Sequence, residues 1–455
     1  MVLSAEEQIS IIVVGGGIGG LTFAVEAHRK GHKVQVFERR ADATAGGESI
    51  LVSSSALPTL YEWPGFEQRI VERRYEGTTA FKKSDGELIA PFVYSGSAGQ
   101  SVFIYRYVLH KLLLDYAIEQ GINVELNSTG SEFFESGDQA GIILKDGRKF
   151  TADLVIASDG IGSKSWPLFA KSNSYHPVSS GFVLYRRTYH LDDALKNPVV
   201  ARAFQQHEGD FGYFYVGPDS HCLVYKVGVD VGWMLTCRDE NSNAEESWSK
   251  PTSTARAIEV VKDWEPLVPE VIKATPDGSC FDWKMMWRDP QPQWVSDGGR
   301  IVQLGDAAHP FLPTSGSGAT MAIEDSWSLA ACLEIGGKAN LTLATRVHNK
   351  LRFERVSCAQ KLGLKNRELL HKTDWNYVKQ HPEVLGSLYY KKWINEHNPA
   401  KYAVENYNKC AEHILEGKPF ENTNYVPGYK YKPWTVRDVL ELSTKGERIV
   451  DEGDW

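Results

Sequence analysis

The chain of 455 residues lacks the features that mark several broad classes of protein. It has no excess of basic residues: 50 Lys and Arg stand against 58 Asp and Glu, which gives a formal net charge of −8. An acidic chain argues against nucleic acid held by a basic face. No apolar run approaches the ~20 residues that cross a bilayer, and the N-terminus lacks the basic start of a signal peptide. The sequence thus predicts a cytoplasmic protein with no transmembrane segment and no nucleic-acid partner.

Cysteine is scarce and scattered. The six cysteines form no CxxC pair, so neither a zinc knuckle nor a disulfide-stapled scaffold is indicated. Low-complexity segments and repeats with a period of about 20–50 residues are also absent. We therefore expect reduced thiols and no metal site. At about 150 residues per domain, the length predicts two or three domains, or one large fold with a tail. The cysteines are Cys222, Cys237, Cys280, Cys332, Cys358 and Cys410.

A glycine-rich turn near the N-terminus is the first pattern that indicates chemistry. Residues 9–14 form a near-continuous apolar run, which is typical of a strand buried on both faces of a parallel sheet. Gly15, Gly17 and Gly20 then give the spacing G-x-G-x-x-G, and a helix is expected over 21–29. Gly15 permits a tight turn, Gly17 lets the backbone approach a pyrophosphate, and Gly20 lets the helix pack against the strand.

An acidic residue follows where a nucleotide-binding unit requires one. A second strand is expected over 33–37, and it ends at Glu38, 23 residues after Gly15. A carboxylate there can accept hydrogen bonds from the ribose hydroxyls of adenosine, while the helix N-terminus offers N–H groups to the phosphates. The alternative is a glycine-rich turn of any α/β protein. The strand, the helix and the acidic residue Glu38 together favour a dinucleotide-binding site, but they do not distinguish FAD from NAD.

Two more strand-to-loop junctions occur far along the chain. A strand over 154–157 runs into Asp159, and Asp159-Gly160 alone is a common turn. Another strand, over 299–304, delivers Asp306 at its C-terminal end, where open α/β sheets bind ligands. The glycine-rich loop that follows opens a helix whose first N–H groups can stabilise negative charge. The remaining marked positions of this loop are Pro313, Gly316 and Gly318.

Together the three segments resemble the fingerprints of the single-component FAD-dependent aromatic hydroxylases. That family includes salicylate hydroxylase and many fungal secondary-metabolism monooxygenases, and the resemblance covers roughly residues 8–360. It implies FAD as cofactor and NAD(P)H as a co-substrate without its own Rossmann domain, and we find no second strand–GxGxxG–helix unit. By this resemblance the cofactor-binding residues are Gly15, Gly17, Gly20, Glu38, Arg39, Arg106, Asp159, Asp306, Pro313, Gly316, Gly318 and Ala319.

The resemblance also assigns roles and shows departures. Arg106 matches the arginine that the family uses near the FAD pyrophosphate and ribityl chain, and Asp159 matches an aspartate used in joint FAD and NAD(P)H binding. Asp306 can accept a hydrogen bond from a ribityl hydroxyl. The second motif usually ends in arginine, where this chain has Trp166, and the third often has glutamine where this chain has Ser317. These departures bear on NAD(P)H handling and on contacts to the flavin ring.

The predicted fold class is α/β. It comprises a Rossmann-like FAD-binding domain, an inserted mixed or antiparallel β-sheet substrate domain and a helical C-terminal tail. Residues 170–295 show short alternating strands with Gly, Asp and Pro turns, whereas 344–417 are helical and charged. The expected boundaries are 1–75, 106–170 and 296–365 for the FAD-binding domain, 76–105 and 171–295 for the substrate domain, and 366–455 for the C-terminal extension.

The predicted substrate domain supplies the catalytic candidates Arg186 and Tyr185, and the first segment of the predicted FAD-binding domain supplies Glu48. Arg186 and Arg187 are adjacent in one strand, so one of them should face the inter-domain cavity. By resemblance, Arg186 lies where fungal indole-oxidising relatives place an arginine over the flavin; a surface arginine on an edge strand is the alternative. One wall is aromatic, which suits a flat polycyclic substrate, although core packing is the alternative for most of its members. They are Tyr185, Tyr189, Tyr213, Tyr215, Tyr225, Trp233, Trp283 and Trp287.

The resemblance implies a monooxygenase in which NAD(P)H reduces FAD and a flavin C4a-hydroperoxide transfers one oxygen atom of O2 to an electron-rich aromatic natural product. Phenol hydroxylases often use a histidine or tyrosine base, and no histidine lies near 46–50. We therefore favour indole 2,3-epoxidation leading to a spirooxindole, with Glu48 as a candidate base or ribose neighbour. The alternative is phenol hydroxylation or oxidative dearomatisation. An FAD dehydrogenase, a halogenase and a non-enzymatic flavoprotein stay open, and we expect a monomer or weak homodimer.

Overall fold

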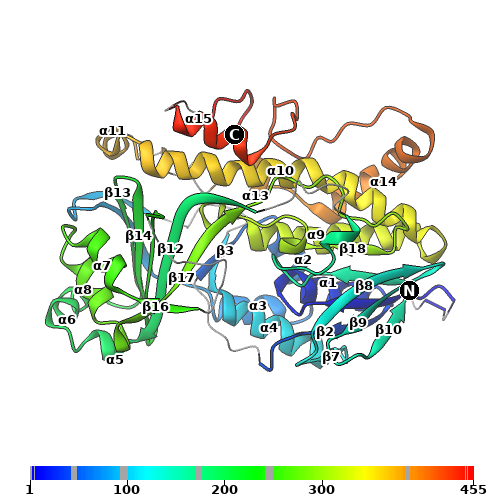
Figure 1. Cartoon of the computed structure of the whole chain (residues 1–455), viewed down its shortest axis with the longest axis horizontal. Coiled ribbons are helices and arrows are strands. Elements are labelled where there is room, and N and C mark those ends of the chain that lie inside the picture. The colour runs from blue at the N-terminus through cyan, green and yellow to red at the C-terminus, as the bar shows by residue number, and fades with distance from the viewer. Residues whose placement is uncertain are drawn as a thin grey trace.

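The molecule has two lobes joined by long helices (Figure 1). A large sheet with its own small helices forms the lobe at the left of the view, and a parallel sheet with its covering helices forms the lobe at the right. The computed structural model describes residues 3–4, 6–42, 49–92, 101–169, 177–240, 250–382, 384–385, 390–445, 447 and 449–455.

The right-hand lobe is built on a five-stranded sheet in the order β18-β11-β1-β2-β7, in which every neighbouring pair is parallel. Parallel strands are covered on both faces, which is why β1 and β11 are almost entirely apolar and buried. Helices α1, α4 and α9 pack over one face and form the main core. The bounds are β1 Ser10–Val14, α1 Ile18–Arg29, β2 Lys33–Phe37, α4 Arg106–Glu119, β7 Asn123–Glu125, β11 Leu154–Ala157, β18 Ile301–Gln303 and α9 Gly318–Gly336.

Two smaller sheets complete this lobe. The antiparallel sheet β10-β9-β8 covers the other face of the parallel sheet, and the two share a separate apolar cluster that includes Val14, Val155 and Ile142. Strands β3 and β6 pair with each other. The bounds are β3 Ser49–Val52, α2 Leu57–Tyr61, α3 Phe66–Val71, β6 Val102–Tyr105, β8 Gly130–Ser136, β9 Gln139–Leu144 and β10 Lys149–Ala152.

The left-hand lobe is an eight-stranded sheet in the order β16-β17-β12-β15-β14-β13-β4-β5. It is antiparallel except for the parallel pair β13–β4, and helices α5 to α8 bury one of its faces in a second core. The opposite face is left to meet the other lobe. The bounds are β4 Thr78–Lys83, β5 Leu88–Phe92, β12 Val178–His190, α5 Leu191–Ala194, α6 Pro198–Phe204, β13 Phe211–Gly217, β14 Ser220–Val227, β15 Asp230–Arg238, β16 Pro251–Ser253, α7 Ala255–Val261, α8 Leu267–Lys273 and β17 Ser279–Trp287.

Helices of the last third of the chain tie the lobes together. Helix α10 packs on α9 and α14 along the right-hand lobe and also contacts β13 and β14 of the large sheet (Figure 1). The predicted α/β class, with a mixed second sheet and a helical C-terminal region, is confirmed. No helix in the described ranges is long and apolar enough to cross a membrane. The remaining bounds are α10 Leu341–Lys372, α11 Trp375–Gln380, α13 Lys392–Asn395, α14 Pro399–Glu416 and α15 Val436–Thr444, with short 3₁₀ turns at Trp166–Leu168, Pro276–Gly278, Gly305–Ala307, Pro313–Ser315 and Lys338–Asn340.

Candidate active site

A cavity of about 510 Å³ lies between the two lobes, and the three predicted loops meet on its wall. Strands β1, β11 and β18 are neighbours in the parallel sheet, so their C-terminal ends share one edge. The loops that follow them carry Gly15, Asp159 and Asp306. The lining includes every residue predicted to bind the cofactor: Gly15, Gly17, Gly20, Glu38, Arg39, Arg106, Asp159, Asp306, Pro313, Gly316, Gly318 and Ala319.

The three motif glycines differ in what surrounds them. Gly15 has φ +106°, and a Cβ there would lie 2.3 Å from the carbonyl oxygen of Ser158. A Cβ on Gly20 would lie 2.1 Å from the carbonyl oxygen of Gly15. A Cβ on Gly17 would meet no atom within 4 Å, because this residue faces the open cavity at the start of α1. Gly15 and Gly20 therefore serve the packing of the turn, whereas Gly17 leaves room for a ligand.

Backbone N–H groups fix the Glu38 carboxylate at the end of β2. Gly16 donates to Oε2 at 2.6 Å, and Arg40 donates to Oε1 at 2.9 Å. His110 of α4 also contacts this loop, since its Nε2 lies 2.5 Å from the carbonyl oxygen of Gly16. His110 was not predicted, although its place four residues after Arg106 puts both on one helix face and could have indicated it.

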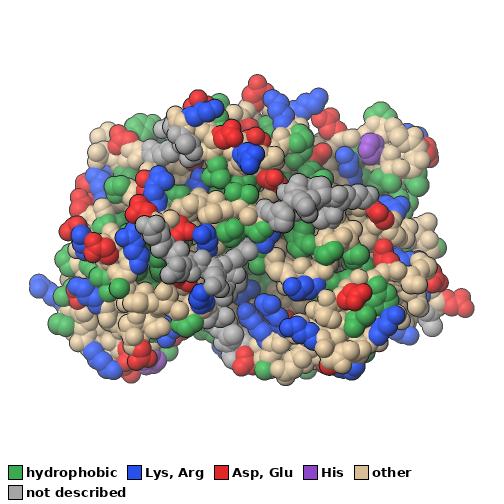
Figure 2. Space-filling view, viewed as in Figure 1, with side chains coloured by type: hydrophobic (Ala, Val, Ile, Leu, Met, Phe, Trp, Pro, Cys, Tyr) green, Lys and Arg blue, Asp and Glu red, His purple; other side chains and the backbone are tan. Residues whose placement is uncertain are grey.

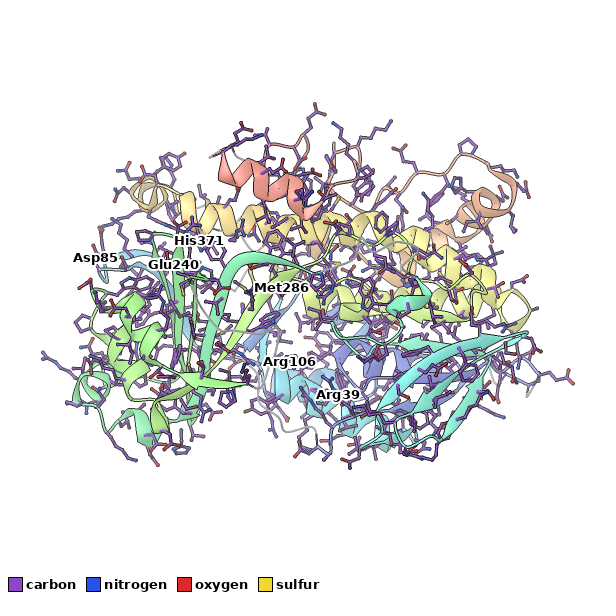
Figure 3. The ribbon with its side chains drawn as sticks, in the orientation of Figure 1. Arg39, Asp85, Arg106, Glu240, Met286 and His371 are labelled. Atoms are coloured by element: carbon purple, nitrogen blue, oxygen red, sulfur yellow. The ribbon has the colours of Figure 1, made fainter. Side chains whose placement is uncertain are left out.

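Positive charge gathers where the dinucleotide loops face the other lobe. Arg39, Arg40, Arg106 and Lys164 all line the cavity. Figure 3 places Arg39 and Arg106 at the junction of the two lobes, and Figure 2 shows Lys and Arg side chains beside the hollow on this face. Guanidinium and ammonium groups in this position match the charge of a pyrophosphate.

Two aspartates supply hydrogen-bond acceptors to the cavity. Asp159 accepts from the N–H of Lys164 at 3.0 Å through Oδ2, and its Oδ1 is buried with no hydrogen-bond partner in the described ranges. Burial raises the pKa of Asp159, although the nearby Ser163 hydroxyl and the Lys164 N–H oppose the shift. The Asp306 side chain is exposed to the cavity, and the protein atoms packed around it raise its pKa. Both carboxyls are placed to bind hydroxyl donors of a ligand.

The third loop is fastened by a buried carboxylate of α9. Asp325 accepts a hydrogen bond from the N–H of Gly305 at 3.4 Å and another from Nε2 of His309 at 2.5 Å. Arg352 of α10 donates to the same carboxylate through Nε at 2.8 Å. His309 therefore holds the loop in place and does not face the cavity.

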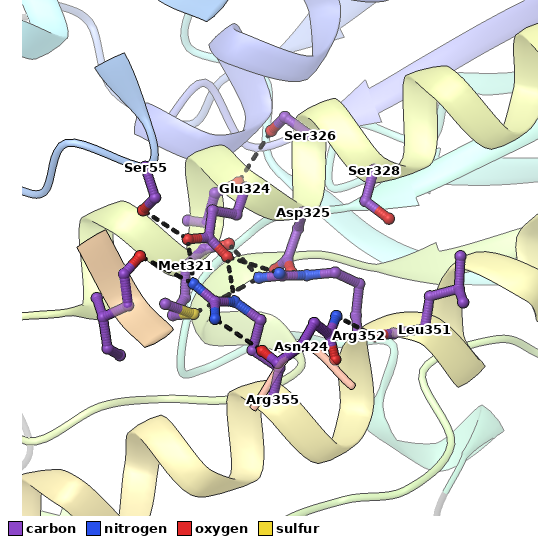
Figure 4. Close-up of polar contacts among 12 residues, drawn as sticks. Ser55, Met321, Glu324, Asp325, Ser326, Ser328, Leu351, Arg352, Arg355 and Asn424 are labelled. Carbon is purple, nitrogen blue, oxygen red and sulfur yellow. Dashed lines mark hydrogen bonds and ion pairs between the residues drawn. The ribbon is translucent and has the colours of Figure 1, made fainter. Parts of the chain in front are cut away.

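A second carboxylate extends this network toward the C-terminal segment (Figure 4). Glu324 accepts from Arg352 at 2.6 Å, from both Arg355 Nε and Arg355 Nη2 at 2.8 Å, and from the hydroxyl of Ser55 at 2.7 Å. All four groups are buried. Arg355 donates further to backbone carbonyl groups of the C-terminal segment, at Trp393, Ile394 and Asn424.

We predict that this network makes the fold sensitive to acid below about pH 4.5. Burial alone would raise the pKa of Glu324, but the charges of Arg355 and Arg352 outweigh it and lower the pKa from 4.5 to about 2. A carboxyl with a lowered folded-state pKa stabilises the fold fully above its unfolded pKa, and this contribution is lost as the pH falls toward the folded value. Urea unfolding at a series of pH values should show the loss between about pH 4.5 and 2. A Glu324→Gln variant that kept the same pH dependence over this interval would contradict the assignment.

The cavity extends from the dinucleotide loops to the free face of the large sheet. Alternate residues of β14 line it, because successive side chains of a strand point to opposite faces. Neighbouring strands add mostly apolar side chains, which makes this half of the cavity suited to a hydrophobic ligand. The lining on this side includes Leu184, Phe214, His221, Leu223, Tyr225, Val227, Met234, Thr236 and Trp283.

The structure changes the view of the predicted catalytic residues. Tyr185 lies on the opposite face of β12 from Leu184 and is buried in the core formed with α7 and α8, so its assignment to the site is corrected. Arg186 shares the face of Leu184 and is buried, with its guanidinium carbon 5.9 Å from the ring centre of Phe281. Among the described residues that line the cavity, Arg186 does not appear. Glu48 lies outside the described residues.

The aromatic residues that line the cavity are largely different from those predicted. Of the eight aromatic residues named from the sequence, Tyr225 and Trp283 line the cavity. Tyr189, Tyr213, Tyr215 and Trp233 belong to or pack against the core on the back of the sheet. The reason is the two-residue period of a strand, which sends half of its aromatic side chains to each face. Trp166, which stands where the second motif of the family usually has an arginine, is not among the described residues that line the cavity.

Comparison with known proteins identifies the cofactor of this cavity. Residues 8–350 match the family described as "FAD binding domain". The FAD-dependent monooxygenase fsr3 of Gibberella fujikuroi is 36% identical over 98% of this chain and 89% of its own length. The chain belongs to the FAD-dependent monooxygenases. Within this family it is similar to enzymes of fungal secondary metabolism and to aromatic hydroxylases, as the motifs predicted.

Other FAD-dependent monooxygenases and solved structures agree with this assignment. Notoamide E oxidase notB' of Aspergillus versicolor is 30% identical over 93% of this chain and 95% of its own length. The crystal structure of CtdE with FAD and substrate 4 is 33% identical, covers 90% of this chain and 100% of its own, and superposes with a TM-score of 0.81. A salicylate hydroxylase complex at 20% identity and a TM-score of 0.71 shares the fold.

FAD is therefore the cofactor of this monooxygenase, and NAD(P)H use is typical of the family. The residues present fit FAD on structural grounds. The open space beside Gly17 admits a pyrophosphate, the unpartnered Oδ1 of Asp159 can accept from a hydroxyl group, and Arg39 and Arg106 supply the compensating charge. Glu38, held by two N–H groups, can accept hydrogen bonds from ribose hydroxyls.

Proposed function

We propose that this monooxygenase uses NAD(P)H and O2 to insert one oxygen atom into an electron-rich, polycyclic aromatic natural product. The other oxygen atom leaves as water, and the two electrons come from NAD(P)H. The observation that carries the proposal is the single cavity that joins the FAD-binding loops to an apolar sheet wall. Such a cavity brings a flat substrate and the cofactor together in one space between the lobes.

The residues of the chain divide into two groups in this proposal. The loops after β1, β11 and β18 bind and orient the cofactor, and bound FAD supplies the redox chemistry with oxygen. The apolar side chains Leu184, Leu223 and Met234 hold the aromatic substrate and exclude water, which limits wasteful side reactions. Arg186 is retained as a proposed catalytic residue, because it lies on the same face of β12 as Leu184, which lines the cavity.

Two substrate classes are proposed. Indole 2,3-epoxidation leading to a spirooxindole is supported by the similarity to notoamide E oxidase and by the absence of a histidine in the sequence near 46–50. Phenol hydroxylation or oxidative dearomatisation is supported by a polar pair on the sheet wall, His221 and Thr236. The two classes differ in whether the substrate must carry an oxygen atom before it reacts.

The test is substrate-stimulated NADPH oxidation by the FAD-loaded enzyme. Indoles and naphthols are tested one at a time, and oxygen uptake is measured for each. The masses of the products are determined by mass spectrometry. We expect at least one compound to raise NADPH oxidation and to gain one oxygen atom. The same protein stripped of FAD serves as the control and should be inactive. Oxygen uptake that yields only hydrogen peroxide with every substrate unchanged would contradict a monooxygenase, and turnover without oxygen uptake would indicate a dehydrogenase.

We further propose that the enzyme acts in the cytoplasm as a monomer or weak homodimer. All six cysteines are unpaired and buried, which fits a reducing compartment. Light scattering after size exclusion tests the oligomeric state: a mass near 50.9 kDa at low concentration is expected, and a stable larger assembly would contradict it.

A further inference from the structure

Two histidines meet where the cavity borders the large sheet. His221 is in β14 and lines the cavity, and His371 is near the end of α10. Nδ1 of His221 lies 3.1 Å from Nε2 of His371. The ring of His221 stacks on Phe214 at 5.3 Å, and the ring of His371 lies 5.1 Å from Phe182. The pair is thus fixed by one hydrogen bond and by aromatic packing on both sides.

His221 leaves one ring nitrogen for a ligand. Its side chain is 8% exposed, and Nδ1 is engaged by His371. Within the described part of the chain, Nε2 of His221 has no hydrogen-bond partner. His221 lines the cavity, so a ligand bound there can supply a hydrogen-bond partner for Nε2.

The surroundings keep both rings neutral. Burial, together with the nearby charges of Arg367 and Arg238, lowers the pKa of His371 to about 3. Burial and His371 together lower the pKa of His221 well below its usual value. Asp219 accepts from Arg238 at 3.0 Å at this end of the sheet, and Glu368 lies beside Arg367 on α10. Both imidazole rings are therefore neutral at neutral pH. His221 is suited to form a hydrogen bond with a ligand and is too weakly basic to remove a proton from it.

The cavity wall beside His221 has polar side chains at both ends and an apolar side chain between them. Thr236 pairs directly with His221 across β14 and β15, and its side chain also lines the cavity. Leu223 and then Tyr225 come next on the same face of β14. The hydroxyl oxygen of Tyr225 lies 3.0 Å from the hydroxyl oxygen of Thr188. At about 3.3 Å per residue, His221 and Tyr225 are roughly 13 Å apart along the strand. Two polar ends separated by an apolar middle match a flat polycycle that carries oxygen.

We infer that His221, held by His371 and assisted by Thr236, binds an oxygen substituent of the substrate, so that the enzyme selects aromatic polycycles already bearing a hydroxyl or carbonyl group. The inference rests on the proposed function and narrows it. With Nδ1–H donated to His371, Nε2 accepts from a hydroxyl; with the opposite tautomer, Nε2–H donates to a carbonyl. His221 is the ligand-contacting residue, and His371 is a positioning residue.

The experiment measures binding rather than turnover, so it does not depend on finding the natural substrate. The probes are 2-naphthol and its methyl ether, and their dissociation constants are read from changes in the absorption of the bound flavin. We expect the naphthol to bind the FAD-loaded enzyme about fivefold more tightly, because one neutral hydrogen bond contributes on the order of 1 kcal/mol. The preference should be constant from pH 5.5 to 8, since the ring is neutral throughout.

Variants of the pair provide the controls. His221→Leu should remove the preference for the naphthol without weakening the ether, and His221→Gln should restore part of it because an amide also hydrogen-bonds. His371→Leu should reduce the preference and leave FAD binding unchanged. His207→Leu is the matched control, since His207 bonds to Tyr213 in the same lobe but does not line the cavity.

Three results would overturn the inference: equal binding of naphthol and ether by the natural enzyme, a preference that survives in His221→Leu, or no binding of either probe. Failure of the proposed function would look different. In that case the naphthol would bind with the expected preference, while no aromatic compound would gain an oxygen atom.

Discussion

Replacement of Arg355 by methionine should lower the free energy of unfolding by about 3–5 kcal/mol, the usual cost of removing one partner from a buried ion pair. Arg355 and Glu324 are both fully buried. The substitution leaves Glu324 with Arg352 and Ser55 only, and it removes the donor to the carbonyl groups of Ile394 and Asn424. Urea unfolding of the FAD-loaded enzyme at pH 7 measures the change.

An exposed ion pair provides the comparison for Arg355→Met. Arg69 pairs with Glu119 at 2.6 Å, but both side chains reach solvent. Arg69→Met should therefore change the free energy of unfolding by at most about 1 kcal/mol. If both variants lost the same small amount, the network of α9 and α10 would have no special structural role.

Gly17→Ala should separate cofactor binding from folding. Gly17 has φ −76° and ψ −177°, which alanine adopts without strain, and a Cβ there meets no protein atom within 4 Å. The added methyl group projects into the space that a pyrophosphate needs. We expect FAD affinity to fall at least about tenfold, or 1.4 kcal/mol, while the thermal midpoint of the FAD-free protein stays the same. Titration of FAD into stripped protein, followed by fluorescence quenching, gives the affinity.

Gly15→Ala provides the comparison for Gly17→Ala, because it should affect folding as well as FAD binding. The positive φ of Gly15 and the backbone oxygen of Ser158 at 2.3 Å leave no place for a side chain. Strain of about 1–3 kcal/mol and a backbone clash should destabilise the FAD-free protein as well as abolish FAD binding. Equal stability of the two FAD-free variants would show that the turn is looser than its geometry implies.

The dinucleotide half of the site could be predicted because its signals are local. Gly15, Asp159 and Asp306 each follow a short apolar run, and the geometry of a parallel sheet then brings the three loops to one edge. The predicted cofactor residues accordingly line one cavity. The role of His309 was not predicted, because its partner Asp325 lies on a different element and is revealed only by packing.

The substrate half could not be predicted to the same depth. On β12 a difference of one residue decides whether a side chain faces the cavity, like Leu184, or the core, like Tyr185. His221 and His371 are 150 residues apart, and no local pattern links them. Similarly, the sequence predicts a helix after the third glycine-rich loop, but nothing in it indicates that Arg352 and Arg355 contact Glu324 of that helix.

Helix α10 has a consequence for how a substrate enters. Its 32 residues span about 48 Å at 1.5 Å each, with Arg352 and Arg355 anchored in one lobe and Leu370 and His371 against the sheet of the other. A continuous helix that is packed against both lobes holds them at a fixed distance from each other. The lobes cannot swing apart as a hinge unless this helix bends or unwinds, so passage into the chamber must depend on movements of single loops or side chains at its rim.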